Sequence, residues 1–386
     1  MRVFLIAGEA SGDKLGAALI SGLKQLTTPA FSGVGGPLMQ AEGMDSLFPM
    51  DELSIMGLAE VLPKYLHLKR RIAQTAAAVI AARPDVLVTI DSPDFCLRVA
   101  RLVKAQSDIR TVHYVAPSVW AWRPGRAAKM ARVIDHVLAL LPFEPPYMEA
   151  AGMECDFVGH PVVAEPQASE AEAQEFRARH GIGDAPLLLA LPGSRRGEVA
   201  RLAPRFGTAL ARMMPAHPGM RVVVPTTANV TDMVQDLLRD WPVAPIVLDP
   251  RDMNSGAYAA EKRAAFRAAD VALAASGTVS LELAAADTPM VIAYDMNPVS
   301  RFLIGRMLRI DTVTLVNLVS DTRTVPECLG RGCTPEAIAD ALDAVMRKPG
   351  SQLDAMRLTM ERLGKGGTPP GLRAAQAIID RLPTGR

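Results

Sequence analysis

The chain has 386 residues, a formal net charge of +1 and 49% hydrophobic residues. Its length is too great for one ordinary hydrophobic core and suits two domains of roughly 150–200 residues each. A nearly neutral chain lacks the basic field that nucleic-acid binding uses, so we expect no nucleic-acid partner.

The four cysteines, Cys96, Cys155, Cys328 and Cys333, form no Cys-x-x-Cys pair, and no histidine completes a zinc-like spacing. We therefore expect reduced thiols and no metal site. The chain begins with an apolar stretch rather than a signal peptide, and no apolar run reaches the ~18–20 residues that span a bilayer. These features predict a cytoplasmic protein and leave contact with a membrane surface open.

Short apolar runs, most of them rich in Val and Ile, alternate with amphipathic segments along the chain. The predicted strands are Val3–Ala7, Asp85–Ile90, Thr111–Val115, His136–Leu141, Asp156–Val158, Leu187–Leu191, Arg221–Val224, Pro245–Leu248, Val271–Ala274 and Met290–Ala293. The predicted helices include Lys14–Leu26, Lys69–Ala82, Val199–Met214, one starting after Thr334, and Pro370–Leu382. This alternation predicts the α/β class, with parallel sheets covered by helices on both faces.

A polar stretch, Val162–Glu172, interrupts the alternation and is typical of an interdomain linker. We predict an N-terminal Rossmann-like domain over 1–165, a C-terminal one over 166–345, and a helical tail over 346–386 that crosses back toward the first domain. Two doubly wound domains facing one another would leave a central cleft, because such sheets bind ligands at the carboxyl ends of their strands.

The first candidate turn spans residues 8–13 and reads Gly-Glu-Ala-Ser-Gly-Asp between a predicted strand and helix. Its glycines would let backbone N–H groups approach a ligand. Its spacing fits neither a dinucleotide-binding glycine turn nor a P-loop, and Glu9 would repel a pyrophosphate. The turn therefore suits a hydroxyl-bearing ligand or a positioned carboxylate, and an ordinary capped turn fits the spacing equally well.

The second candidate turn carries Asp91 and Asp94 just after a predicted strand. Either carboxylate is placed to take a proton from a hydroxyl as a general base. Alternatively, Asp91 caps the turn and Asp94 starts the next helix.

The third candidate turn reads Pro-Ser-Val-Trp-Ala-Trp-Arg over residues 117–123. Trp120, Trp122, Arg123 and Arg126 suit a sugar or an anionic group, because aromatic rings stack on sugar faces and Arg forks onto phosphate. The alternative is that the tryptophans pack beneath a long loop.

Two turns in the second half are better candidates for a diphosphate. Residues 191–198 read Leu-Pro-Gly-Ser-Arg-Arg-Gly-Glu at a predicted helix N-terminus, where glycine and arginine favour an anion. Residues 275–282 read Ala-Ser-Gly-Thr-Val-Ser-Leu-Glu, where Glu282 is placed to accept two ribose hydroxyls. Each turn alone fits a solvated or capping role, and it is their combination that predicts a nucleotide site.

The segment 55–71 combines apolar and basic side chains: Leu62, Lys64, Tyr65, Leu66, Leu68, Lys69, Arg70 and Arg71. This composition fits a helix lying on an anionic membrane surface. A buried helix with a charged outer face fits it equally well.

The motifs in these turns resemble those of the lipid-A-disaccharide synthase family, glycosyltransferases with the two-Rossmann-domain (GT-B) fold. The resemblance runs in family order from residue 3 to about residue 330, and its most specific strings are Glu-Ala-Ser-Gly-Asp at 9–13 and Trp-Ala-Trp at 120–122. Other matching stretches are 33–43, 90–95, 113–119, 157–161, 191–195, 275–278 and 315–318. One departure is Val-Pro-Glu-Cys-Leu-Gly at 325–330, where the family commonly has Leu and then Gln after Pro-Glu.

The resemblance implies transfer of 2,3-diacylglucosamine from UDP to the 6-hydroxyl of 2,3-diacylglucosamine 1-phosphate. The products are the β-1,6 disaccharide 1-phosphate and UDP. An α-linked donor and a β-linked product imply inversion by one direct displacement. The resemblance also implies no metal and no cofactor, and peripheral association with the cytoplasmic face of the inner membrane. It leaves a homodimer open.

Carried onto this sequence, the resemblance and the turns give three sets of residues. The candidate bases are Asp91, Glu9 and Asp94, of which Asp91 is the first choice as the base or its orienter. The predicted substrate-binding residues are Ser11, Trp120, Arg123 and Asn317. The predicted UDP-binding residues are Gly193, Ser194, Arg195, Ser276, Gly277, Thr278 and Glu282.

Two other functions fit the same turns. A UDP-sugar 2-epimerase shares this two-domain fold and a similar nucleotide half, but it needs only one sugar site and no apolar acceptor surface. A nucleotide-sugar sensor would bind the same ligand without turnover.

Overall fold

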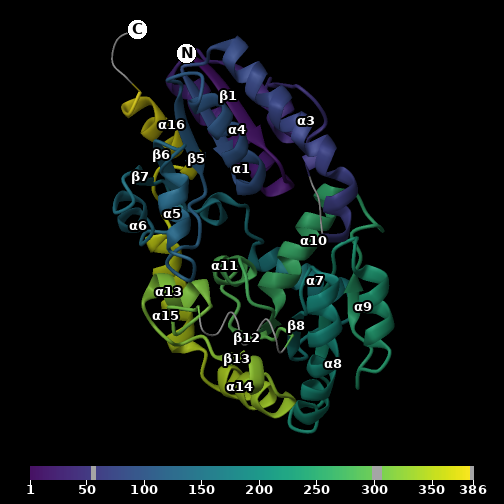
Figure 1. The fold of residues 1–386 in the computed structure, drawn as a ribbon. Coiled ribbons are helices and arrows are strands. Elements are labelled where there is room, and N and C mark those ends of the chain that lie inside the picture. The colour runs from purple at the N-terminus through teal and green to yellow at the C-terminus, as the bar shows by residue number, and fades with distance from the viewer. Residues whose placement is uncertain (54–57, 298–306, 383–386) are drawn as a thin grey trace. The chain divides into compact units, whose positions relative to one another are not determined.

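The computed structural model describes residues 1–53, 58–297 and 307–382, and the side chains of 58–65 lie outside this description. The chain divides into two compact units (Figure 1). Unit 1 comprises Met1–Ala164 together with the chain from Leu363 onward, and unit 2 comprises Glu165–Arg362.

Unit 1 is built on a seven-stranded sheet in the order β3-β2-β1-β4-β5-β6-β7, and all of its strand pairs are parallel. The strands are β1 (Arg2–Ala7), β2 (Ala30–Val34), β3 (Asp45–Ser46), β4 (Val86–Ile90), β5 (Arg110–Tyr114), β6 (His136–Ala139) and β7 (Glu154–Phe157). The helices are α1 (Ala10–Leu26), α2 (Pro37–Ala41), α3 (Leu58–Ala82), α4 (Pro93–Lys104), α5 (Gly125–Met130), α6 (Pro145–Glu149) and α16 (Pro370–Asp380), with short 3-10 helices at Met50–Leu53 and Pro161–Ala164.

The core of unit 1 lies on both faces of this sheet. All five residues of β4 are buried, as expected for a parallel strand covered by helices on both sides. Helix α1 places Leu15, Leu19 and Leu23 on one buried stripe, because residues four apart share a helix face.

The last helix, α16, packs against α1 although they lie at opposite ends of the chain (Figure 1). A Cβ atom at Gly22 would lie 2.6 Å from the carbonyl oxygen of Gly371, and one at Gly371 would lie 2.5 Å from that of Ala18. Glycine at both positions therefore permits the close approach of the two backbones.

Unit 2 contains a six-stranded sheet in the order β10-β9-β8-β11-β12-β13, again with parallel pairs. The strands are β8 (Leu187–Leu191), β9 (Arg221–Pro225), β10 (Ile246–Leu248), β11 (Val271–Ala274), β12 (Met290–Tyr294) and β13 (Glu327–Leu329). The described helices are α7 (Glu170–Arg179), α8 (Arg196–Met213), α9 (Thr231–Leu238), α10 (Ser255–Ala268), α11 (Val279–Ala285), α13 (Leu315–Ser320), α14 (Pro335–Arg347) and α15 (Gly350–Arg362), with a 3-10 turn at Gly330–Gly332.

Local capping signals place several helix starts in unit 2. Ser169 and Glu172 form a reciprocal capping box at the start of α7. The Thr334 hydroxyl accepts a hydrogen bond from the backbone of Ala337, which starts α14. The core beneath includes Trp241, whose indole N–H donates to the carbonyl of Ala203 at 3.0 Å.

When the strands of each unit are numbered from its own first strand, both sheets contain the order 3-2-1-4-5-6. This is the strand order of dinucleotide-binding folds, which bind their ligands where the order reverses. The predicted class, α/β with two Rossmann-like parallel sheets, is confirmed. In unit 1 the order reverses between β1 and β4, and in unit 2 between β8 and β11. The turns after these four strands are therefore the places to look for a ligand.

Some boundaries differ from the sequence-based prediction. Helix α1 begins at Ala10 rather than Lys14, so most of the predicted turn at 8–13 is the first turn of this helix. Strands β2, β3 and β13 were not predicted, because they are short or carry glycine, and both features weaken the strand pattern.

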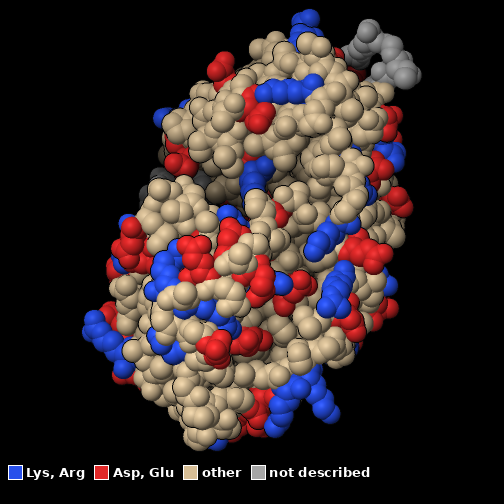
Figure 2. All heavy atoms as spheres, turned by 180° about the vertical axis from the view of Figure 1, so that it is seen from behind, with Lys and Arg blue, Asp and Glu red and all other residues tan. Residues whose placement is uncertain are grey.

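On the face drawn in Figure 2, acidic and basic side chains are interspersed.

Candidate active site

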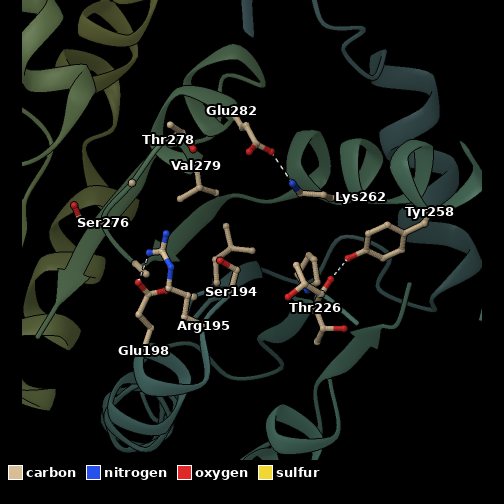
Figure 3. Close-up of a pocket in the computed structure, with 16 residues that line it drawn as sticks. Ser194, Arg195, Glu198, Thr226, Tyr258, Lys262, Ser276, Thr278, Val279 and Glu282 are labelled. Carbon is tan, nitrogen blue, oxygen red and sulfur yellow. Dashed lines mark hydrogen bonds and ion pairs between the residues drawn. The ribbon is translucent and has the colours of Figure 1, made fainter. Parts of the chain in front are cut away.

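A cavity of about 520 Å³ opens at the carboxyl edge of the unit 2 sheet, where the strand order reverses (Figure 3). It is lined by Leu191, Gly193, Ser194, Arg195, Glu198, Pro225, Thr226, Thr227, Tyr258, Lys262, Ala275, Ser276, Gly277, Thr278, Val279 and Glu282. The structure thus brings together all seven residues predicted to bind UDP, which come from turns about 80 positions apart in the sequence.

The two glycine turns give this cavity its exposed backbone. Gly193 and Gly277 have φ values of 114° and 154°, a region that favours glycine. Asn229 donates a hydrogen bond to the carbonyl of Ser194 at 3.0 Å and so holds the first turn in place. The 18-residue helix α8 starts directly after Arg195, so its N-terminal amides add an anion-favouring dipole at this turn.

The charged side chains of the cavity are paired with one another. Arg195 contacts Glu198 at 2.9 Å, and Lys262 contacts Glu282 at 2.6 Å, as Figure 3 shows. The Arg195 side chain is nevertheless 78% exposed, so it is accessible to a ligand.

Helix α10 and the turn after β9 also line the cavity, and no motif in the sequence predicts their contribution. Tyr258 and Lys262 lie four residues apart on α10 and both line the cavity. The Tyr258 hydroxyl donates to the carbonyl of Thr226, which follows β9 (Figure 3). Their spacing of four residues indicates that they share a helix face. No sequence pattern nearby indicates which cavity this face lines.

In unit 1, strained backbone collects at the corresponding edge of the sheet. Asp91 and Ser92, which follow β4, have φ values of 50° and 42°, and Val115, which follows β5, has 88°. Positive φ is costly for such residues, above all for a β-branched one, and strain of this kind concentrates at functional sites. Gly8 lies beside this turn, because a Cβ added there would fall 2.6 Å from the Ser92 hydroxyl.

The three candidate bases differ in their surroundings. Asp91 is half-buried at the strained turn, and no described residue hydrogen-bonds its side chain. Glu9 is exposed at the N-cap of α1 and makes no side-chain capping bond. Asp94 is exposed in the first turn of α4. Glu9 and Asp91 follow the neighbouring strands β1 and β4, in which Ala7 pairs with Ile90.

The other polar residues of the first turn divide between surface and core. Ser11 is exposed in the first turn of α1. Asp13 is 2% exposed, and its carboxylate accepts hydrogen bonds of 2.9–3.0 Å from the backbone amides of Gly36, Leu38 and Met39. Asp13 therefore caps α2 and holds the glycine turn at 35–36 in place.

The turn over residues 117–123, hereafter the tryptophan turn, is held in place by contacts of Trp120. Trp120 is half-buried, packs edge-on against Phe143, and donates its indole N–H to Glu144 at 3.2 Å. Glu144 is buried and also accepts from the backbone amides of Leu140 and Leu141. Burial raises the pKa of the Glu144 carboxyl to about 7 although these hydrogen bonds lower it.

Arg123 lies on the exposed side of the same turn. Its guanidinium stacks 4.4 Å above the Trp122 ring, and its backbone φ is 51°. With Asp94, Gly125, Arg126 and Lys129 it lines a second, wide hollow of about 770 Å³ within unit 1.

Asn317 is placed differently from the other predicted substrate-binding residues. It is 1% exposed, and its amide exchanges hydrogen bonds of 3.0 Å with the backbone N–H and carbonyl of Val325. Glu327, in the segment that departs from the family pattern, accepts hydrogen bonds from the backbone of Val313 and Thr314. Both side chains therefore hold the 312–317 segment against β13.

The apolar and basic segment 55–71 is described only in part. Ile55–Gly57 and the side chains of Leu62, Lys64 and Tyr65 lie outside the described residues. On α3, Leu66 is 70% exposed, whereas Leu68 packs against the buried cluster of unit 1. The Arg71 side chain forms an ion pair with Glu52. Within the described parts of the chain, no helix is both long and apolar enough to cross a membrane.

Among the described residues, no three His, Cys, Asp or Glu side chains gather in a way that would hold a metal ion. All four cysteines are buried, and none of them forms a disulfide bond.

Comparison with solved structures identifies the fold. A UDP-GlcNAc 2-epimerase from Neisseria meningitidis, bound to UDP-GlcNAc, aligns over 99% of both chains with a TM-score of 0.64 and 12% identity. The Staphylococcus aureus protein MnaA in complex with UDP aligns over 98% of this chain and 94% of its own, with a TM-score of 0.63 and 11% identity. At such identities the likeness shows the two-domain fold and no more.

Sequence comparison identifies the family. The model of the family described as lipid-A-disaccharide synthetase matches residues 3–366. The lipid-A-disaccharide synthase of Ruegeria pomeroyi is 70% identical over 99% of this chain and 96% of its own length. That of Rhodospirillum centenum is 48% identical over 98% of this chain and 94% of its own. The chain therefore belongs to the lipid-A-disaccharide synthase family, whose members are glycosyltransferases that form the lipid A disaccharide.

Proposed function

We propose that the chain transfers 2,3-diacylglucosamine from UDP to the 6-hydroxyl of 2,3-diacylglucosamine 1-phosphate, with inversion at the anomeric carbon. The observation that carries this proposal is the cavity in unit 2, where the two glycine turns and Glu282 meet at the switch point of the sheet. This is where doubly wound sheets bind nucleotides. The similar fold of a UDP-GlcNAc 2-epimerase bound to UDP-GlcNAc also supports a UDP-sugar at this site.

The donor would be held by its diphosphate and its ribose. The exposed backbone at Gly193 and Gly277 and the N-terminus of α8 offer amides to the phosphate oxygens. Arg195 would supply a charged donor to the same group. Glu282, held by Lys262, would accept the ribose hydroxyls. These contacts stabilise the negative charge that UDP acquires as it leaves, so they act in the transition state as well as in the ground state.

The acceptor would react in a single displacement. Its 6-oxygen attacks the anomeric carbon, the bond from that carbon to UDP breaks, and UDP leaves with the bonding electrons. Asp91 would take the hydroxyl proton, because its carboxylate lies at the strained edge of unit 1 with no hydrogen bond from a described residue. Glu9 follows the neighbouring strand and remains the competing base.

The lipid substrates call for contact with a membrane. Leu66 is exposed on α3 beside exposed Lys69 and Arg70, a combination that suits an anionic lipid surface. We propose that this part of α3 binds the cytoplasmic face of the inner membrane peripherally.

Purified protein in neutral detergent micelles tests the proposed reaction. With UDP-2,3-diacylglucosamine and 2,3-diacylglucosamine 1-phosphate together, we expect equal amounts of UDP and disaccharide 1-phosphate. Isomerisation of the donor sugar without the acceptor would instead identify an epimerase. Binding of the UDP-sugar without acceptor-dependent release of UDP would identify a sensor.

A further inference from the structure

The hollow in unit 1 lined by Asp94, Arg123, Gly125, Arg126 and Lys129 is hereafter the basic hollow. Asp94 is a candidate base and Arg123 a predicted substrate-binding residue, but the hollow as a whole has been given no ligand so far. We propose that it binds a phosphomonoester, namely the anomeric phosphate of the acceptor. The identity of this ligand rests on the proposed function, whereas the chemistry of the site does not.

The charge of the basic hollow matches such a ligand. Its lining carries three cationic side chains and one carboxylate, a formal charge of +2. A phosphomonoester carries about −1.5 to −2 at neutral pH, so it would neutralise this lining. No described carboxylate forms an ion pair with Arg123, Arg126 or Lys129, whereas Arg71, Arg110 and Arg381 of the same unit are each paired with a carboxylate.

The side chains of the basic hollow come from two directions. Arg126 and Lys129 lie three residues apart on α5 and so share one face of that helix. Arg123 comes from the preceding loop, where its stacking on Trp122 at 4.4 Å restricts the guanidinium. A stacked guanidinium offers a fixed fork of donors, which suits the tetrahedral oxygens of a phosphate.

Backbone strain supports a role in binding. Arg123 has a φ of 51° although it is neither glycine nor asparagine. A strained residue held by its surroundings is typical of a ligand site. The strain places the Arg123 side chain at the basic hollow, next to the cations of α5.

The position of the basic hollow fits an acceptor that is anchored by its phosphate and reacts at a nearby hydroxyl. Asp94 lies three residues after Asp91, in the first turn of α4. The anomeric phosphate and the 6-hydroxymethyl group are carried by C1 and C5, the two carbons that flank the ring oxygen. A phosphate in the basic hollow would therefore anchor the sugar a few bonds from the hydroxyl that reacts, near the turn that carries the proposed base.

The first experiment measures binding and needs no turnover. Tryptophan fluorescence would follow titration of the wild-type protein with glucosamine 1-phosphate, and with glucosamine as the reference ligand. We expect the phosphate ester to bind more tightly, and the double variant Arg126→Gln/Lys129→Gln to lose roughly tenfold or more of that affinity. Arg132→Gln, an exposed arginine just after α5 that does not line the hollow, is the matched control and should change nothing. Equal binding of the two ligands, or equal loss in Arg132→Gln, would overturn the proposal.

The second experiment measures turnover in neutral micelles, where no anionic bilayer lipid is present. The double variant should raise the KM for 2,3-diacylglucosamine 1-phosphate roughly tenfold or more and leave the KM for the UDP-sugar unchanged. With an acceptor that lacks the phosphate, the variant and the wild type should have equal KM values. An equal rise for both acceptors would overturn the proposal.

Phosphatidylglycerol vesicles distinguish the acceptor phosphate from a bilayer headgroup. If the double variant sediments less with vesicles while its KM in micelles is unchanged, the basic hollow binds headgroups and the proposal is wrong. If the wild type forms no disaccharide at all, the proposed function fails, and the fluorescence titration still decides whether the hollow binds a phosphomonoester.

Discussion

At the carboxyl edge of the unit 1 sheet, Asp91, Ser92 and Val115 all have positive φ. Each belongs to a turn that directly follows a buried strand, and backbone hydrogen bonds fix both turns to the sheet, from Asp91 to Tyr114 and from Val115 to Leu138. The strain is therefore maintained by the sheet itself. At the scale of the residue, this fixes the backbone position from which the Asp91 side chain extends.

Asp91→Asn should abolish disaccharide formation, because an amide cannot accept the hydroxyl proton. UDP affinity should stay within about 0.5 kcal/mol of the wild type, since the cavity that we propose binds UDP lies in unit 2. Steady-state turnover and calorimetric titration with UDP measure the two effects. Glu9→Gln and Asp94→Asn are the comparison variants. Full activity in Asp91→Asn would show that another carboxylate is the base.

Arg195→Ala should weaken UDP binding by about 1.5–3 kcal/mol, the range for hydrogen bonds to charged groups. The neighbouring Arg196 is exposed and does not line the cavity, so Arg196→Ala is a matched control that should bind UDP normally. Equal UDP affinities in the two variants would remove Arg195 from the site.

Glu144 predicts a pH dependence of stability. Burial raises its pKa in the folded protein from 4.5 to about 7, so the folded state holds the proton more tightly than the unfolded state does. The resulting contribution to the free energy of unfolding is complete below pH 4.5 and is lost as the pH rises through 7. It amounts to no more than about 3 kcal/mol. Thermal melts of wild type and Glu144→Gln should therefore converge at pH 5 and diverge in favour of the variant at pH 8. Parallel melting temperatures at both values would contradict this.

At the scale of the element, the contact between α1 and α16 depends on two glycines. Gly22→Ala should destabilise unit 1 by about 1–3 kcal/mol, because the new methyl would overlap the Gly371 carbonyl. Gly350→Ala, at the start of α15, meets nothing within 4 Å and should leave stability unchanged or raise it by up to about 1 kcal/mol. Urea unfolding midpoints of the two variants test this, and equal midpoints would show that the helices separate without cost.

Helix α3 predicts a membrane contact at one described leucine. Leu66→Ser should reduce sedimentation with phosphatidylglycerol vesicles roughly tenfold, since burying a leucine contributes about 1.5–3 kcal/mol. Leu38→Ser on α2, also an exposed leucine, is the control and should have no effect. Leu68 is unsuitable for this test because it packs against the buried cluster of unit 1. If Leu66→Ser and Leu38→Ser sediment alike, α3 does not bind the membrane through Leu66.

At the scale of the whole molecule, two sheets with the same strand order carry different turns. The fold is shared with UDP-GlcNAc 2-epimerases at 12% identity, so the fold by itself does not select the reaction. Family membership over residues 3–366 does select it, as lipid A disaccharide formation. The features of unit 1 that we propose bind the acceptor are the strained turn at Asp91, the turn that carries Trp120 and the basic hollow.

Much of the fold follows from local patterns. All ten predicted strands are present, because buried parallel strands form continuous apolar runs with clear boundaries. The short strands β2, β3 and β13 lack such runs and become recognisable only beside their neighbours. Helix α1 starts four residues before its predicted start, since its first turn contains the polar and glycine residues that usually mark a loop.

The sequence by itself determined the alternation of strands and helices, the two phosphate-type turns of unit 2 and the resemblance to the family. These features are local, because periodicity and turn chemistry reflect each segment's own hydrogen bonds and burial. Tertiary structure decided which side chains share a site. It directs Asp13 to the amides at 36–39, buries Asn317 against Val325, and brings Tyr258 and Lys262 of α10 to the cavity of unit 2. It also gathers Asp94 with Arg126 and Lys129 in the basic hollow. Strand order sets these juxtapositions, and no local pattern in the sequence encodes that order.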